Sequence, residues 1–179
     1  RGWLEDYYPN GSVLHKGYYI DGQLKTYKNF YENGRTERDF KTLDSYKSTM
    51  LLYYPDGTLK SNIQYKNGLP LVWEDFHPNG KLEYMEEFDK NMEYYLVKKS
   101  FFINGQMEMV FELTDTKKLI YSQKEYFESG ILKEEGKLVF NRGIFDYQKI
   151  GKWMYYDETG KLTRDEQYEE GRIIKDTDY

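Results

Sequence analysis

The side chains that could carry out chemistry are two histidines and several pairs of neighbouring carboxylates. His15 and His77 could ligate a metal ion, and Glu74-Asp75, Glu86-Glu87 and Glu134-Glu135 could act as acid and base. The two histidines share no metal-ligand spacing. Adjacent residues of a β-strand point to opposite faces, so the paired carboxylates cannot converge on one substrate atom. Their expected role is a solvated surface.

The sequence contains none of the common catalytic motifs. It has no Cys, no His-Glu-x-x-His zinc motif, no Gly-x-Ser-x-Gly nucleophile elbow and no glycine-rich phosphate loop. We therefore predict that the chain is not an enzyme, has no catalytic residue, and binds neither a cofactor nor a metal ion.

The glycines instead mark an internal repeat. Two aromatic residues, a turn and a glycine recur seven times, as in Tyr53-Tyr54-Pro55-Asp56-Gly57. The repeats are centred on turns at Gly11, Gly34, Gly57, Gly80, Gly105, Gly130 and Gly160, which step by 23, 23, 23, 25, 25 and 30 residues. A fixed period of this kind indicates a repeat architecture.

The turn residues predict how each repeat folds. Pro-Asn-Gly and Pro-Asp-Gly favour a type I turn followed by a glycine bulge, a common three-residue hairpin connection. A second turn signal follows 11 residues after the first, as in Asp21-Gly22 and Asn67-Gly68. Two turns per repeat predict about 14 strands of roughly seven residues. The last copy has one more residue before Gly160, which predicts a longer turn there.

Residue alternation predicts the two faces of these strands. Counted from each turn glycine, the third, fifth and seventh residues are mostly polar, and the second, sixth and eighth are mostly apolar. The proposed turn places the first aromatic of a pair opposite the second residue after the glycine. The expected cross-strand pairs are Tyr7 with Val13, Tyr53 with Leu59, Phe76 with Leu82, and Tyr126 with Leu132.

Composition supports an all-β fold. The chain has no Ala but has 20 Tyr, 10 Phe and 3 Trp, so strand-forming residues dominate. We predict a single repeat domain over residues 1–179, an elongated, open, single-layer antiparallel sheet of about seven stacked hairpins. At about 4.8 Å per strand it would extend about 65 Å.

Charge and hydropathy limit the classes of partner. The net charge is −5 and both signs are interspersed, which argues against nucleic acid. No apolar run approaches the roughly 20 residues of a membrane span, so no membrane insertion is expected. The chain opens on Arg1-Gly2-Trp3, apparently inside a repeat, which suggests a trimmed N-terminus. Cytoplasmic and exported locations both stay open, with a lean towards export to the cell envelope.

The repeat resembles the MORN-repeat variant family of bacteria. The resemblance is carried by the spacing, the aromatic pair before Asn-Gly or Asp-Gly, the Lys-Leu of Gly80-Lys81-Leu82 and Gly160-Lys161-Leu162, and Gly151-Lys152-Trp153. It covers nearly the whole chain and is weakest at residues 114–123 and 136–150. It implies a single-layer sheet that binds proteins or lipids, and some bacterial members are described as antitoxin components.

The interval from Gly130 to Gly160 departs most from the repeat, because it is seven residues longer than the standard step. We assign one of these residues to the last turn and six to the apolar stretch 139–147. One interpretation is a lengthened hairpin that packs on its neighbours. The other is a projection that presents binding residues to a protein partner, since aromatic residues and Arg are enriched at binding hot spots. The candidate partner-binding residues are Phe140, Arg142, Ile144, Phe145 and Tyr147.

Two functions remain open from the sequence. The first is a non-catalytic scaffold that recognises a protein partner through an extended sheet surface, in an antitoxin-like manner. The second is an exported envelope-surface or carbohydrate-binding repeat protein that uses exposed Tyr and Phe rings. A continuous track of exposed rings would favour the carbohydrate, whereas one apolar patch rimmed by charge would favour a protein.

Overall fold

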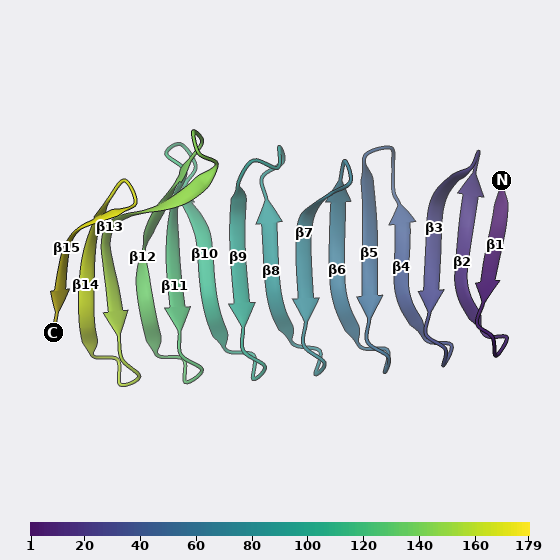
Figure 1. The fold of residues 1–179 in the computed structure, drawn as a ribbon, viewed down its shortest axis with the longest axis horizontal. Coiled ribbons are helices and arrows are strands. Elements are labelled where there is room, and N and C mark those ends of the chain that lie inside the picture. Colours follow the sequence, from purple (N-terminus) through teal and green to yellow (C-terminus); the bar gives the residue numbers. More distant parts are fainter. The chain divides into compact units, whose positions relative to one another are not determined.

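The chain folds entirely into β-strands joined by turns. The structure is a computed structural model that describes residues 1–179, and it divides into two compact units, Arg1–Glu83 and Tyr84–Tyr179. Within each unit the strands are antiparallel and follow one another in chain order (Figure 1). The predicted all-β, open antiparallel meander of hairpin repeats is confirmed. No helix is long and apolar enough to cross a membrane.

The strands are 6 to 11 residues long. The first unit contains β1 (Gly2–Tyr7), β2 (Val13–Ile20), β3 (Gln23–Phe30), β4 (Thr36–Thr42), β5 (Lys47–Tyr53), β6 (Leu59–Lys66) and β7 (Leu69–Phe76). After β8 (Leu82–Phe88), which begins at the boundary, the second unit contains β9 (Tyr95–Phe101), β10 (Met107–Asp115), β11 (Ile120–Tyr126), β12 (Leu132–Asn141), β13 (Asp146–Tyr156), β14 (Leu162–Glu169) and β15 (Arg172–Asp178).

The structure has 15 strands where the sequence predicted about 14. The difference arises because each of the seven repeats contributes two turns, and 14 turns separate 15 strands. Whether the two units act as the single domain expected for residues 1–179 stays a prediction.

The first turn of each repeat has the predicted geometry. At the first copy, Gly11 N–H donates to the Tyr8 carbonyl at 2.9 Å, and Tyr8 N–H donates to the Ser12 carbonyl at 2.8 Å. Gly11 has φ of 85°, and the Asn10 side chain accepts the Ser12 N–H at 2.9 Å. This is a type I turn closed by a glycine in the left-handed region. The next five copies repeat the pattern of two backbone hydrogen bonds.

The last turn corrects the sequence prediction. Gly160 N–H donates to the Asp157 carbonyl and Asp157 N–H donates to the Lys161 carbonyl, both at 2.9 Å, so this turn has the same length as the others. Tyr156 pairs with Leu162 across the strands. Asp157 therefore takes the place of the second aromatic, and the additional residue lies in the strand before the turn.

The second turns at Asp21-Gly22, Asn67-Gly68 and Glu170-Gly171 have positive φ at both central residues, between 49° and 79°. Positive φ at both positions defines the type I′ hairpin turn, whose twist matches that of the flanking strands. The expected second turn signal is therefore a true hairpin turn at these three copies.

Cross-strand register places the apolar residues on one face. Tyr7 pairs with Val13, Tyr53 with Leu59 and Tyr126 with Leu132, as predicted, and the pair of Phe76 with Leu82 stays a prediction. In the first unit a row of directly opposed side chains crosses five strands, and its members are Tyr27, Phe40, Met50, Ile63 and Trp73. Ile63 is the buried hydrophobic residue of this row, at 1% exposure.

Tyrosine hydroxyls connect successive repeats of the first unit. The second tyrosine of each aromatic pair donates to the backbone carbonyl of the first aromatic one repeat later. The three bonds run from Tyr8 to Phe30 at 2.8 Å, from Tyr31 to Tyr53 at 2.7 Å, and from Tyr54 to Phe76 at 2.9 Å. The second aromatic place thus ties neighbouring hairpins together. The sequence motif gave no sign of this bond.

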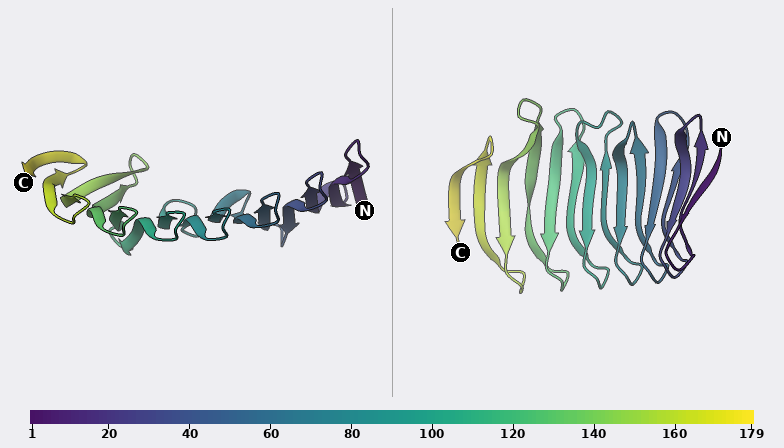
Figure 2. Two further views of the ribbon diagram at one scale, coloured as in Figure 1. Left: turned by 90° about the horizontal axis from the view of Figure 1, so that it is seen from below. Right: turned by 45° about the vertical axis from the view of Figure 1, so that its right-hand side comes forward.

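The main hydrophobic core lies in the second unit. Its buried members are Phe111, Leu119, Tyr121, Leu138, Phe140 and Trp153, which come from β10 to β13 and the turn before β11. The later strands of this unit curl away from the plane of the earlier ones (Figure 2). This curl brings side chains of β13 over the apolar face of β9 to β11.

Candidate functional site

The hairpin of β12 and β13 is distorted by a large bulge. Glu135 pairs with Met154 and Lys137 with Ile150, so that Gly136 alone faces the three residues 151–153. A Cβ on Gly136 would lie 2.2 Å from the ring of Trp153. The absence of a side chain at Gly136 therefore makes room for Trp153, which is fully buried and donates its Nε1–H to the Lys137 carbonyl at 3.1 Å.

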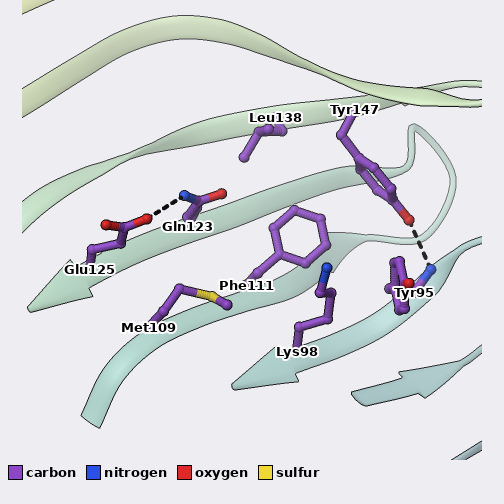
Figure 3. A pocket seen from close by; sticks show the side chains of 8 residues that line it. All are labelled: Tyr95, Lys98, Met109, Phe111, Gln123, Glu125, Leu138 and Tyr147. Atoms are coloured by element: carbon purple, nitrogen blue, oxygen red, sulfur yellow. Dashed lines mark hydrogen bonds between the residues drawn. The ribbon is translucent and has the colours of Figure 1, made fainter. Parts of the chain in front are cut away.

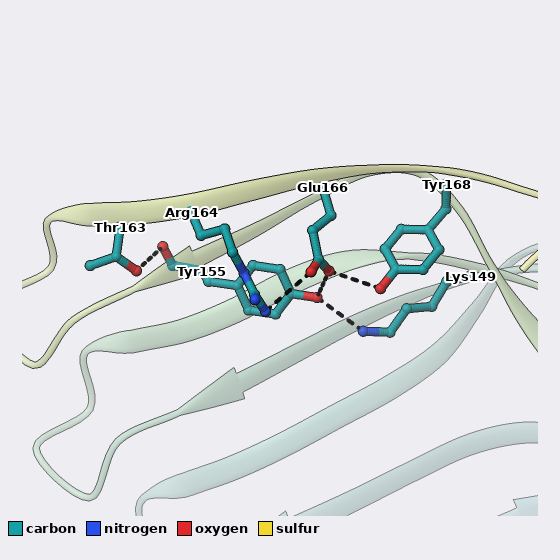
Figure 4. A network of polar contacts seen from close by, with 6 residues as sticks. All are labelled: Lys149, Tyr155, Thr163, Arg164, Glu166 and Tyr168. Atoms are coloured by element: carbon teal, nitrogen blue, oxygen red, sulfur yellow. Dashed lines mark hydrogen bonds and ion pairs between the residues drawn. The ribbon is translucent and has the colours of Figure 1, made fainter. Parts of the chain in front are cut away.

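A polar network holds the base of this hairpin against β14 (Figure 4). The hydroxyls of Tyr155 and Tyr168 donate to one Glu166 carboxylate oxygen at 2.5 and 2.8 Å. Arg164 lies 3.2 Å from the other oxygen. Burial acts to raise the pKa of Glu166, but the two hydroxyls and the Arg164 guanidinium outweigh it and lower the pKa below its usual value. Glu166 is therefore a structural carboxylate that stays ionised.

Lys149 joins this network from β13 through aromatic rings. Its Nζ lies 3.8 Å from the centroid of the Trp153 ring and donates to the Tyr155 hydroxyl at 3.1 Å. The ring of Tyr168 lies 5.3 Å from the same Nζ. Cation–π contacts of this kind each contribute about 0.5 to 2 kcal/mol. The contacts of Lys149 hold β13 in place, and β13 carries the end of the hairpin that folds over the sheet.

Tyr147, near the start of β13, reaches across the sheet to β9. Its hydroxyl oxygen accepts the backbone N–H of Tyr95 at 2.9 Å. Phe111 and Tyr121 are stacked with ring centroids 4.6 Å apart, and the Tyr147 ring stands edge-on to both at 5.0 Å. Burial raises the pKa of Tyr147, so the hydroxyl stays protonated at neutral pH. These contacts lock β13 over the apolar face.

A pocket of about 240 Å³ lies beside Tyr147 (Figure 3). Its lining consists of apolar side chains on the floor and polar groups at the rim, namely Tyr95, Lys98, Met109, Phe111, Gln123, Glu125, Leu138 and Tyr147. The floor comes from β9 to β12 and Tyr147 forms one wall. This combination of an apolar interior and a few polar groups at the rim suits a bulky apolar side chain.

The charges around the pocket are uneven. At one end, the Lys98 ammonium lies 4.5 Å from the Tyr95 ring. At the other end, Glu125 lies directly opposite Glu134 on the neighbouring strand, and Lys133 is 3.5 Å from Glu125. Glu134 itself makes no hydrogen bond or ion pair. Burial, and then the charge of Glu125, raise the pKa of Glu134. This rim has a carboxylate that a cation would stabilise.

The candidate residues named from the sequence separate into two groups. Phe140 is 6% exposed and belongs to the core, so the expectation that it is presented on the surface is wrong, whereas Tyr147 is half-buried and forms a wall of the pocket. Ile144 and Phe145 are 58% and 74% exposed, and Arg142 is exposed with its guanidinium 3.6 Å from Glu93. The structure brings the exposed group to the loop between β12 and β13, here called the tip (residues 142–145). A partner-binding role for it stays a prediction.

Asn141 organises the tip. Its side-chain oxygen accepts the Gly143 N–H at 2.9 Å, its carbonyl accepts the Ile144 N–H at 3.3 Å, and its amide donates to Gln148 at 2.9 Å. Phe145 has φ of 52°, in the left-handed region that large side chains rarely adopt. Its exposed ring gains little from burial within the chain. Leu119 has nearly the same φ, 53°, in the turn before β11, and its side chain is buried, so Phe145 differs from it in exposure and not in backbone conformation.

Most of the pocket residues were missed by sequence reasoning. Alternation did place Phe111 on the apolar face, and no pattern marked Tyr95, Gln123 or Glu125. Strand pairing places the residues of β9 to β11 on one face, and the wall formed by Tyr147 is added because β13 folds over the sheet. No group of three or more His, Asp or Glu side chains lies close enough to hold a metal ion.

Four segments of the chain match the family model described as MORN repeat variant. They are residues 4–21, 49–67, 70–90 and 149–170. Each of these segments is therefore similar to the MORN-variant repeat. MORN repeats are generally modules that bind proteins or membranes, and the fold described above fits a binding scaffold. The tip and all the residues that line the pocket lie between the matched segments 70–90 and 149–170. A search of the curated proteins finds no match for the sequence.

Two solved structures resemble part of this chain. One is described as TarM, with 13% sequence identity and a TM-score of 0.35 over 53% of this chain. The other is an S. aureus TarM mutant in complex with fondaparinux, α-GlcNAc-glycerol and UDP, with 13% identity and a TM-score of 0.36 over 54% of this chain. The matches cover 19% and 20% of those proteins, so this chain corresponds to about a fifth of their length. Likeness at this level says nothing of function.

Proposed function

We propose that the chain is a non-catalytic binding scaffold that recognises a protein partner through the second unit. The observation that carries the proposal is the tip, whose Ile144 and Phe145 are 58% and 74% exposed beside an apolar pocket with charged rim groups. Exposed apolar groups set among charges are typical of protein interfaces. The net charge of −5 favours a protein over nucleic acid as the partner.

The carbohydrate alternative requires a continuous track of exposed rings. The exposed aromatic residues instead lie at separate places, at Trp3 and Tyr7 on the edge strand β1, at Tyr46 in a turn, at Phe145 on the tip and at Tyr179 at the chain end. Most other rings are half-buried between neighbouring strands. This distribution supports the protein partner.

The proposal is tested by affinity capture from the native bacterium with three forms of the chain. Phe145→Ser removes the exposed ring, and Ile103→Ser is the matched control, since Ile103 is 58% exposed on another turn of the same unit. We expect a protein that the wild type and Ile103→Ser capture and that Phe145→Ser loses. Equal capture by all three forms, or no captured protein, would contradict the proposal.

An antitoxin-like role is the narrower form of this proposal, in which the partner is a bacterial protein that the scaffold inhibits. It predicts that the captured protein arrests growth when it is expressed alone and does not when this chain is co-expressed. If expression of the captured protein alone does not arrest growth, the antitoxin-like role is wrong and the chain is a binding scaffold with another role.

A further inference from the structure

The tip and the pocket have complementary chemistry, although each belongs to the same chain. The tip offers an exposed Phe145 with Arg142 three residues before it. The pocket offers an apolar interior of about 240 Å³ with Glu125 at its rim and Glu134 directly across from Glu125. We propose that a second copy of the chain is the partner at this surface, with the tip of each copy inserted into the pocket of the other.

The tip is prepared for insertion. Asn141 accepts the backbone N–H groups of Gly143 and Ile144, which holds the tip backbone, so little conformational entropy remains to be lost on binding. Phe145 is kept at positive φ, and its ring is 74% exposed with one edge-on contact, to the Phe140 ring at a centroid distance of 6.2 Å. Inserting the ring into an apolar pocket would give it the burial that its own chain does not provide.

The charged residues of the tip and of the pocket rim are complementary, as their apolar residues are. Arg142 is exposed and makes one long ion pair, with Glu93 at 3.6 Å. Glu134 is half-buried and makes no hydrogen bond or ion pair. Because Glu125 already has Lys133 at 3.5 Å, an Arg142 guanidinium brought from a second copy would pair with Glu134. Opposite charges placed in this way fix the register of an interface more than they add affinity.

The places of the tip and the pocket allow two copies of the chain to bind each other reciprocally. Tyr147 forms a wall of the pocket and lies two residues after Phe145, so the tip and the pocket are connected through the first residues of β13. A two-fold axis beside Tyr147 can bring each tip to the opposite pocket, as required for a self-complementary dimer. The tip alone is a small contact, so the association should depend on concentration.

The test is sedimentation velocity of the full chain over a wide concentration series. We expect the mass to rise from the 21.7 kDa of one chain towards twice that value. Phe145→Ser removes the inserted ring, and Gln123→Trp fills the pocket without removing a core side chain. Each should weaken association at least tenfold, whereas Ile103→Ser should leave it unchanged. Circular dichroism and thermal melting of each variant show that it is folded.

Mixing the two interface variants separates specific pairing from general stickiness. Phe145→Ser keeps an intact pocket and Gln123→Trp keeps an intact tip, so the mixture retains one of the two contacts and should associate more strongly than either variant alone. The charge variants give a second readout. Arg142→Glu and Glu134→Lys should each weaken the dimer, and the chain that carries both should recover it.

The inference rests on the proposed function because it uses the same surface. A chain that stays monomeric at every concentration, or an association that Phe145→Ser leaves intact, would overturn it. If the chain is monomeric while capture of a different protein still depends on Phe145, the inference fails and the proposed function stands.

Discussion

Gly136→Ala tests how the bulge positions the site. The added Cβ would lie 2.2, 2.3 and 2.5 Å from three atoms of the Trp153 indole. Ordinary carbon contacts are about 3.5 to 4.0 Å, so the ring would have to move by more than about 1 Å. Trp153 has no exposed surface, so moving its ring requires the side chains around it to move as well. Overpacking of a core costs about 1 to 3 kcal/mol, and we expect the upper end of that range.

The assay is equilibrium urea unfolding of the wild type, Gly136→Ala and a matched glycine variant. Gly2→Ala is the control, because a Cβ at Gly2 meets nothing within 4 Å. It should change the free energy of unfolding by less than about 0.5 kcal/mol. The loss in Gly136→Ala should be accompanied by altered tryptophan fluorescence and by weaker association, since Trp153 and Tyr147 share β13.

A double-mutant cycle assigns the cost to the contact itself. In a Trp153→Leu background the smaller side chain leaves room for the Cβ, so adding Gly136→Ala should cost less than about 1 kcal/mol. The coupling free energy between the two sites should then be about 2 kcal/mol or more. A cost of Gly136→Ala equal to that of Gly2→Ala, or a coupling near zero, would refute the packing argument.

Three further predictions follow from individual contacts. Tyr31→Phe removes the 2.7 Å hydrogen bond to the Tyr53 carbonyl and should lower the free energy of unfolding by about 1 kcal/mol in a urea titration. Phe102→Tyr adds a hydroxyl at the equivalent place of a later repeat and should raise the free energy of unfolding in the same titration. The raised pKa of Glu134 means that the folded state binds the carboxyl proton more tightly than the unfolded state, so the ionised form destabilises the fold at pH 7. Glu134→Gln should therefore raise the melting temperature at pH 7, and this gain should disappear at a pH low enough to protonate carboxyl groups. An equal gain at pH 7 and at the low pH would contradict this prediction. Phe145→Asn puts a residue that tolerates positive φ at the tip, so calorimetry should show unchanged or higher stability. The same variant should lose the association of two copies. A clearly destabilised variant would mean that the Phe145 ring stabilises the fold.

The turns could be predicted because their chemistry is local. Pro9, Asn10 and Gly11 set the dihedral angles of their own hairpin, and the strand register follows from the turn. The period-two alternation then assigns the faces. These features need no information from elsewhere in the chain, so the sheet and its cross-strand pairs were within reach of the sequence.

The binding surface was only partly predictable because it depends on contacts between distant residues. Gly136 allows a bulge only because Trp153, 17 positions away, fills the space above it. The bulge changes which side chains of β13 face the core, so the apolar stretch 139–147 could not be sorted into buried and exposed residues by composition. Phe140 and Phe145 look alike in sequence, and the fold buries one and exposes the other.

The most direct test of the central claim, that the tip of the second unit binds a protein, is site-specific photo-crosslinking in cells. A photo-reactive amino acid replaces Phe145 in one form of the chain and Ile103 in the other, two exposed positions on different turns. The account predicts a discrete crosslinked protein, either a second copy or another partner, from the form substituted at Phe145 and none from the form substituted at Ile103. No crosslink at Phe145, or the same products at both positions, would contradict it.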